Sequence, residues 1–230
     1  MREDEPLVAE GRDVRDELVS WADERVASLA RGRTVDVGCG EGRFLREGWT
    51  GVDVDAARLR FARLRSPRVV RADARALPFA ADTFVTALAF RMLNATGAID
   101  AVLLEIRRVL RRGGILLVLT VAAATGSQLR LVDDAARDRR GQGDRLDEEN
   151  GEARLERFFA VTRTERFSRT FRFDDAGAAL DHYARLYLHR GAPDPAETLA
   201  RFERARERMQ ALTPPIEDER RATLFIARKA

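Results

Sequence analysis

The sequence predicts an α/β fold built around a mostly parallel sheet, and two observations lead to this prediction. Short apolar, β-branched runs recur along the chain, and the first three of them end beside a glycine or at an aspartate. Segments with a helical spacing of apolar residues lie between several of these runs. Strands buried on both faces of a parallel sheet have continuous apolar runs of this kind. The runs are Thr34–Val37, Thr50–Asp53, Val69–Ala72, Asp82–Phe90 and Ile115–Val121.

Two more strands are predicted in the second half of the chain. One is indicated by 155–160 and by the alternating aromatic and polar residues of 167–173, and the other is Ala222–Arg228. Helical periodicity predicts helices over 7–31, 56–64, 99–110, 129–137, 176–190 and 195–212, and a helix of only one or two turns over 43–47. The polar stretch 138–152 has almost nothing to bury and reads as a loop, either a lid or a solvated insertion.

Composition limits the class of protein. A chain of 230 residues with 45 % hydrophobic residues can bury a full core, so we expect one domain over 1–230. No apolar run approaches the ~20 residues that cross a bilayer, the first residues lack the apolar core of a signal peptide, and Cys39 is the only cysteine. We therefore expect a cytoplasmic protein. The net charge of +3 is mixed along the chain and does not by itself indicate nucleic acid.

A glycine-rich turn follows the first predicted strand. Gly38, Gly40 and Gly42 alternate there, so the third glycine comes one residue too early for the G-x-G-x-x-G pattern that cradles a pyrophosphate. Asp36 and Glu41 add carboxylates to the same turn, which disfavours an anionic ligand. The turn suits a ligand with a cationic or zwitterionic part, or it is a turn without a ligand.

The stretch Asp36–Gly42 resembles the first motif of class I S-adenosylmethionine-dependent methyltransferases. Glu105–Gly114 is similar to the E-x-x-R-V-L-x-P-G-G signature of the methyltransferase type 11, ubiquinone-biosynthesis-like subgroup, with Arg112 in place of the proline. The resemblance covers about 32–121. It implies a Rossmann-like three-layer sandwich whose seven-stranded, mostly parallel sheet ends in an antiparallel C-terminal strand. It further implies an N-terminal helical segment over 1–31, a cofactor-binding core over 32–121, and substrate-side helices and closing strands over 122–230.

The resemblance also implies that S-adenosyl-L-methionine is the cofactor. Asp36 would address its amino-acid end, Asp53 its ribose hydroxyls, and Asp73 with the Ala74 N–H its adenine, against which Val54 would lie. Asp55 is instead expected to cap the next helix. The expected cofactor residues are Asp36, Gly38, Cys39, Gly40, Gly42, Asp53, Val54, Asp73, Ala74 and Phe90.

The methyl acceptor leaves little trace in the sequence. Arg91 and Asn94 follow the fourth strand and could orient an acceptor, and His182 or Tyr183 could act as a base, although a packed or surface histidine explains His182 as well. His182 and His189 lie ~10 Å apart along one predicted helix, so no metal site is expected. The N-terminal helix either covers the sheet or also lies over the cofactor.

The sequence favours methyl transfer to the oxygen, nitrogen or carbon of a small molecule. One alternative is a tRNA or other RNA methyltransferase, which would require the arginines to form one patch. Another is a protein that binds S-adenosylmethionine without catalysis. A nicotinamide dehydrogenase ranks last because the glycine spacing is wrong for it.

Overall fold

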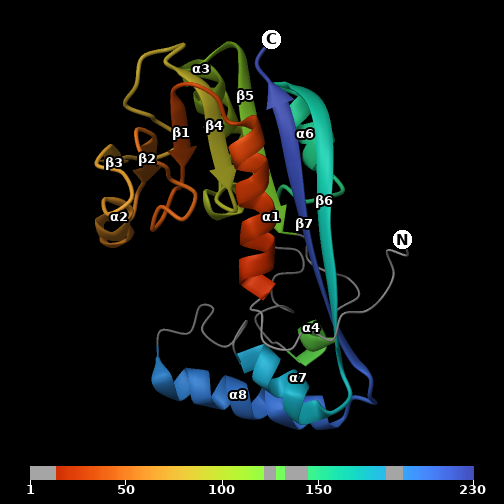
Figure 1. Cartoon of the computed structure of the whole chain (residues 1–230). Coiled ribbons are helices and arrows are strands. Elements are labelled where there is room, and N and C mark those ends of the chain that lie inside the picture. Colours follow the sequence, from red (N-terminus) through yellow and green to blue (C-terminus); the bar gives the residue numbers. More distant parts are fainter. Residues whose placement is uncertain (1–13, 122–127, 133–144, 185–193) are drawn as a thin grey trace. The chain divides into compact units, whose positions relative to one another are not determined.

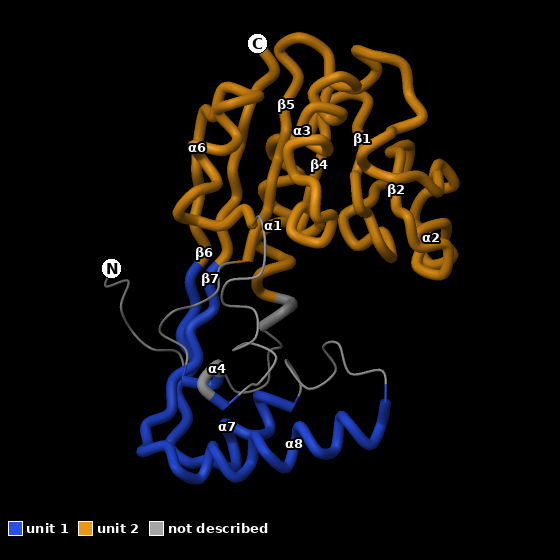
Figure 2. Tube along the Cα trace, turned by 180° about the vertical axis from the view of Figure 1, so that it is seen from behind, with its two compact units in different colours: residues 1–12, 123–142, 168–221 blue, residues 13–122, 143–167, 222–230 orange. Residues whose placement is uncertain are grey.

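The computed structural model describes residues 14–121, 128–132, 145–184 and 194–230. Contacts divide the chain into two compact units, coloured separately in Figure 2. Unit 2 contains Asp13–Ala122, Gly143–Phe167 and Ala222–Ala230, and unit 1 contains Met1–Arg12, Ala123–Gln142 and Ser168–Arg221. The expectation of one domain over 1–230 stays a prediction.

A seven-stranded sheet with the order β3-β2-β1-β4-β5-β7-β6 organises the fold. The pairs β1·β2, β1·β4, β2·β3 and β4·β5 are parallel, whereas β7 lies antiparallel to β5, with Val118 opposite Phe225. The predicted sheet, including the place of the last strand beside the fifth, is therefore confirmed. The strands are β1 (Thr34–Val37), β2 (Thr50–Asp53), β3 (Val69–Arg71), β4 (Phe84–Phe90), β5 (Leu110–Val121), β6 (Ala160–Phe173) and β7 (Ile216–Arg228).

Helices cover both faces of the sheet in unit 2, and the alternation of residues along the strands shows this. Ala87 and Ala89 of β4 belong to the core cluster that contains α3 (Ile99–Val109). Leu88 and Phe90 belong to the cluster that contains α1 (Val14–Leu29). Successive residues of a strand face opposite sides of a sheet, so α3 and α1 lie on opposite faces. Figure 1 shows both helices alongside the sheet, and the predicted three layers are confirmed.

The region between β1 and β2 differs from the prediction. No helix forms over 43–47, where the chain makes a series of turns instead. These turns are closed by short backbone hydrogen bonds, from Gly42 N–H to the Cys39 carbonyl oxygen and from Leu45 N–H to the Gly42 carbonyl oxygen. Only the twelve residues 38–49 cross from β1 to the parallel strand β2, which is at the lower limit for a crossover that contains a helix.

Several other boundaries shift. Leu155 lies in a short helix, α6 (Gly151–Glu156), and not in the sixth strand, which is β6. The strands β5 and β7 both begin earlier than predicted, because tertiary pairing extends them into polar sequence. The helix after β2 is α2 (Ala56–Ala62), and the 3-10 helix η1 (Leu93–Ala95) follows β4.

Unit 1 contains three helices in the residues that the structure describes: α4 (Leu129–Val132), α7 (Ala176–Tyr183) and α8 (Pro195–Gln210). The rest of the helices predicted over 129–137 and 176–190 lies mostly outside the described residues. Within the described ranges, no helix combines the length and apolar character that a membrane crossing requires.

Candidate functional site

A cleft of about 1760 Å³ opens in unit 2 at the carboxyl ends of β1, β2 and β4. This edge is where open α/β sheets bind their ligands. Nine of the ten residues predicted at the cofactor line it, and Gly42 is the exception. The nine are Asp36, Gly38, Cys39, Gly40, Asp53, Val54, Asp73, Ala74 and Phe90. Strand ends that are distant in sequence thus converge on one cavity.

The three glycines of the loop after β1 have different roles. All three have positive φ, but a Cβ on Gly38 would lie 2.5 Å from the Cβ of Met92, and a Cβ on Gly42 would lie 3.0 Å from the Cα of Ala62. Only Gly40 faces open space, with the Arg58 side chain 3.8 Å away as the nearest group. Gly38 and Gly42 therefore make room for the protein's own packing, and Gly40 remains the place where a ligand can approach the backbone.

Asp36 is a buried carboxylate at the base of the cleft. Asp36 is 2 % exposed, and no described residue makes a hydrogen bond to its side chain. Burial, and secondly the charge of Asp53, raises the pKa of Asp36 to about 8. Burial and the two carboxylates also raise the pKa of the neighbouring Cys39 thiol far above its usual range. A cationic group placed in the cleft would favour the ionised form of Asp36.

Asp53, at the end of β2, connects the glycine loop to the next helix. Its Oδ2 accepts from the Gly40 N–H at 2.7 Å, and its Oδ1 accepts from the Asp55 N–H at 2.9 Å. Each carboxylate oxygen has a second lone pair for a ligand hydroxyl. Asp55 itself caps α2 by accepting from the Ala57 and Arg58 N–H groups, as predicted.

Asp73 follows β3 and already has a cationic partner. The Arg75 guanidinium donates to both carboxylate oxygens of Asp73, with Nε–O distances of 3.0 Å. This contact lowers the pKa of Asp73 to about 2. An adenine amino group would therefore share Asp73 with Arg75, a partner that the sequence analysis did not anticipate.

The end of β4 carries one strained residue. Arg91 lines the cleft and has a φ of 60°, which is unusual for a residue other than glycine. Its N–H donates to the Leu119 carbonyl oxygen, so pairing with β5 holds this conformation. Strained backbone at the edge of a cleft is typical of functional sites.

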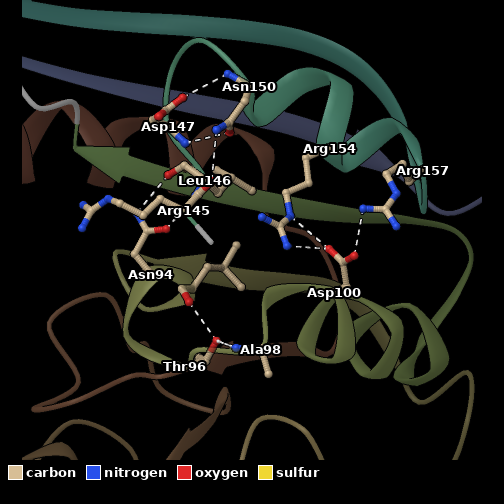
Figure 3. Close-up of polar contacts among 11 residues, drawn as sticks. Asn94, Thr96, Ala98, Asp100, Arg145, Leu146, Asp147, Asn150, Arg154 and Arg157 are labelled. Carbon is tan, nitrogen blue, oxygen red and sulfur yellow. Dashed lines mark hydrogen bonds and ion pairs between the residues drawn. The ribbon is translucent and has the colours of Figure 1, made fainter. Parts of the chain in front are cut away.

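Asn94 does not line the cleft. Its Nδ2 donates to the Leu146 carbonyl oxygen at 2.9 Å and its Oδ1 accepts from the Leu146 N–H at 2.7 Å, as Figure 3 shows. Thr120 of β5 also donates to the Leu146 carbonyl oxygen. We predicted that Asn94 orients an acceptor. In the structure, its amide already makes hydrogen bonds with the backbone of Leu146.

The segment that contains Leu146 is ordered by its own contacts. Asp147 and Asn150 close a turn, and Arg154 donates to Asp100 of α3, which also pairs with Arg157 (Figure 3). The part of the predicted 138–152 loop that the structure describes is therefore fixed to η1 and α3 of unit 2. Residues 138–144 lie outside the described residues.

His182 and Tyr183 lie in unit 1, and both are buried. The His182 Nε2 lies 3.1 Å from Oδ2 of the buried Asp218, and the imidazole packs against the rings of Phe171 and Phe173. His182 has the surroundings of a packed histidine, one of its two predicted interpretations. His189 lies outside the described residues. In the part of the chain that the structure describes, no three His, Cys, Asp or Glu side chains converge as a metal site would require.

The helix α1 contributes residues that the sequence analysis did not single out. Ala22 and Val26 pack on the sheet, whereas Val19, Ser20 and Asp23 line the cleft. An ion pair of 2.9 Å joins Asp23 to Arg46 of the loop after β1. The helix thus both covers the sheet and walls the cleft. In the sequence, the small and charged residues Ser20 and Asp23 beside the apolar stripe of this helix were the signal that could have predicted its place at the cleft.

Comparisons with known proteins agree with this geometry. Residues 35–118 match the family model described as a methyltransferase domain. The match runs from β1 into β5 and covers 84 of the 230 residues. This similarity to a methyltransferase domain agrees with the resemblance of Asp36–Gly42 and Glu105–Gly114 in the sequence. No curated protein matches the chain.

Solved structures share the fold of this chain at low sequence identity. The YcgJ protein from Bacillus subtilis is 16 % identical, with a TM-score of 0.61 and coverage of 93 % of this chain and 98 % of that one. The cyclase SpnF is 22 % identical, with a TM-score of 0.60 and coverage of 96 % and 85 %. A geranyl diphosphate methyltransferase in complex with SAM is 14 % identical, with a TM-score of 0.51 and coverage of 93 % and 85 %. The fold therefore serves proteins with different reactions, so the reaction and acceptor must be argued from the site.

Proposed function

We propose that the cleft of unit 2 binds S-adenosylmethionine through three carboxylates and that the protein transfers its methyl group to a small-molecule acceptor. The observation that supports this best is Asp36, a buried carboxylate without a hydrogen-bond donor among the described residues. Burying an uncompensated carboxylate is costly. A ligand that brings an ammonium and a sulfonium into the cleft supplies the missing positive charge.

In this proposal, the residue at the end of each strand binds a different part of the cofactor. Asp36 addresses the amino-acid end, Asp53 the ribose hydroxyls, and Asp73 with the Ala74 N–H the adenine edge. Val54 is 64 % exposed beside them and offers an apolar surface to the adenine ring. Gly40 leaves the backbone open beside Asp53, to whose carboxylate its N–H donates. Donors, acceptors and an apolar face thus match the parts of one ligand.

When bound, the cofactor supplies a methyl group on a cationic sulfur that leaves as a neutral thioether. The chain then has to hold an acceptor nucleophile in line and exclude water. The aromatic wall formed by Phe90 and Phe44, whose ring centroids lie 4.8 Å apart, excludes water on one side. Arg91 and the residues of α1 provide polar groups on the acceptor side. An acceptor that carries a proton releases it to water when it is methylated, and an acceptor that is already deprotonated needs no general base.

A small acceptor fits the space. Pockets for a single small ligand are typically ~300–1,000 Å³, and this cleft is about 1760 Å³. The cofactor therefore leaves room for a second small molecule in the same cavity. Asp23 and Ser20 of α1 are in place to contact it.

Calorimetric titration with S-adenosylmethionine and with NAD tests the cofactor proposal. Wild-type protein should bind the first and not the second. Asp53→Asn should weaken binding about tenfold or more, because it loses a charge-assisted hydrogen bond. Asp55→Asn is the matched control: it keeps the helix cap, and its affinity should stay within about twofold of wild type. Equal affinity of the two variants would refute the assignment of Asp53.

Transfer of a labelled methyl group tests the reaction. Incubation with pools of small metabolites should label a small molecule. Label recovered in tRNA would favour the RNA methyltransferase alternative, and binding of cofactor without any transfer would favour a non-catalytic protein. A cytoplasmic location remains part of the proposal and is tested by fractionation of the source cells.

A further inference from the structure

Positive charge is concentrated on one short stretch of this chain. Residues 56–75, which form α2, β3 and the turns around them, contain seven arginines and one acid, Asp73. The whole chain has 41 basic and 38 acidic residues. Without this stretch, 34 basic residues face 37 acidic ones, so the remainder is slightly acidic. The arginines are Arg58, Arg60, Arg63, Arg65, Arg68, Arg71 and Arg75, and we call the surface that they form the α2–β3 surface.

Most of this charge is not neutralised by carboxylates. The side chains of Arg60, Arg63 and Arg65 are exposed and make no hydrogen bond or ion pair with any residue that the structure describes. Arg68 and Arg71 donate to backbone carbonyl oxygens, which leaves their charge in place. In the structure, carboxylate partners occur at Arg58, with Asp55, and at Arg75, with Asp73.

Apolar side chains lie among these arginines. Phe61 is 58 % exposed and Leu64 is 85 % exposed, while the buried residues of α2 are Leu59 and Ala62. An exposed aromatic ring between guanidinium groups is a platform on which an unpaired base can stack. Guanidinium groups bind phosphate oxygens in a bidentate manner.

The surface occupies the free edge of the sheet and reaches the cleft. β3 is the edge strand, and Figure 1 shows α2 beside it. Arg58, Phe61, Arg65 and Arg75 line the mouth of the cleft as well. A polymer bound to this surface would therefore lie beside the part of the cleft that contains Asp73, the residue proposed to bind the adenine.

We infer that the α2–β3 surface binds single-stranded nucleic acid. Phosphates pair with the unneutralised arginines, and a base stacks on Phe61. An anionic membrane fits less well, because α2 is only seven residues long and the α2–β3 surface exposes just two large apolar side chains, Phe61 and Leu64. A duplex fits less well, because no element of the surface is long enough to lie in a groove. The inference goes beyond the proposed function and does not depend on it.

Fluorescence anisotropy with labelled 20-nucleotide oligo(U) RNA and oligo(dT) DNA tests the inference on the full chain. Wild type should bind at 50 mM salt with a log–log salt slope of about −2, as expected for three phosphate contacts on a single strand. Arg60→Glu with Arg63→Glu should weaken binding at least tenfold and flatten the slope by about 1.4. Phe61→Ala should weaken binding about fivefold or more at an unchanged slope. Whether the RNA or the DNA binds more tightly identifies the kind of strand.

Arg112→Glu with Arg166→Glu is the matched control, because both residues are exposed and this pair makes the same charge change outside the surface. Its affinity should stay within about threefold of wild type. Equal weakening by the two double variants, no binding at 50 mM salt, or equal binding of phosphatidylserine vesicles would overturn the inference. Arg60 and Arg63 do not line the cleft, so S-adenosylmethionine titration of their double variant should match wild type. Loss of nucleic-acid binding and loss of cofactor binding are thereby separated.

Discussion

The side-chain amide of Asn94 binds the backbone of Leu146 in both directions, donating to its carbonyl oxygen at 2.9 Å and accepting from its N–H at 2.7 Å. The two residues are 52 positions apart in the sequence. This pair ties the end of β4 to the segment before α6, within unit 2.

Asn94→Asp should destabilise the protein by about 1–3 kcal/mol, because a carboxylate oxygen would face the Leu146 carbonyl in place of a donor. Thr120→Val, which removes one further donor to the same carbonyl, should cost about 1 kcal/mol. Urea unfolding measures both. S-adenosylmethionine affinity should change less than threefold in Asn94→Asp, since Asn94 does not line the cleft. A large loss of affinity at unchanged stability would show instead that Asn94 contacts the ligands.

Asp36 should make the ligand-free protein less stable as the pH rises. Its pKa is about 8 in the folded protein and 3.8 as an ordinary carboxyl, so the folded state binds more protons between pH 4 and pH 8. Stability therefore falls through this window as pH increases, and the full cost is present above pH 8. Asp36→Asn should be more stable than wild type at pH 9, by a few kcal/mol at most, and should lose cofactor affinity.

Thermal unfolding between pH 5 and pH 9 measures this difference. Glu41→Gln removes a charge from an exposed residue of the same loop, and it should leave the slope of stability against pH unchanged. Parallel curves for Asp36→Asn and wild type would contradict the assigned role of Asp36.

Gly38→Ala should cost more stability than Gly40→Ala. Both substitutions place a side chain at positive φ, which costs ~1–2 kcal/mol for a residue other than glycine. At Gly38 the new Cβ would also lie 2.5 Å from the Met92 Cβ, whereas at Gly40 the nearest atom is 3.8 Å away on a flexible arginine. Denaturant unfolding compares the two variants directly. Equal losses would mean that Met92 moves aside without cost.

His182→Leu should lower the stability of unit 1 and leave cofactor binding intact. The substitution removes the hydrogen bond to the buried Asp218, a loss of about 1–3 kcal/mol. His182→Gln keeps a donor and should lose less. Unfolding and S-adenosylmethionine titration are measured on both variants. A fall in kcat without a fall in stability would instead make His182 a catalytic base.

Much of the lining of the cleft could be predicted, because many of its residues follow directly after the ends of predicted strands. An apolar run determines where a buried strand ends, and the residue after that end must lie at the carboxyl edge of a parallel sheet. This is why both Asp53 and Asp73 line the cleft, whereas their predicted roles toward the ribose and the adenine came from the resemblance to the methyltransferase family. The cap at Asp55 was equally local, since its partners are two and three residues away.

The sequence by itself therefore determined the sheet, the class of fold and the edge of the sheet at which the cleft opens. Tertiary structure decided what each side chain touches there: Met92 against Gly38, Leu146 on Asn94, and α1 along the cleft wall. These contacts join residues tens of positions apart, and periodicity carries no information about such pairs. Burial of Asp36 has the same origin, because its pKa depends on how strands packed around β1 exclude water from one carboxylate.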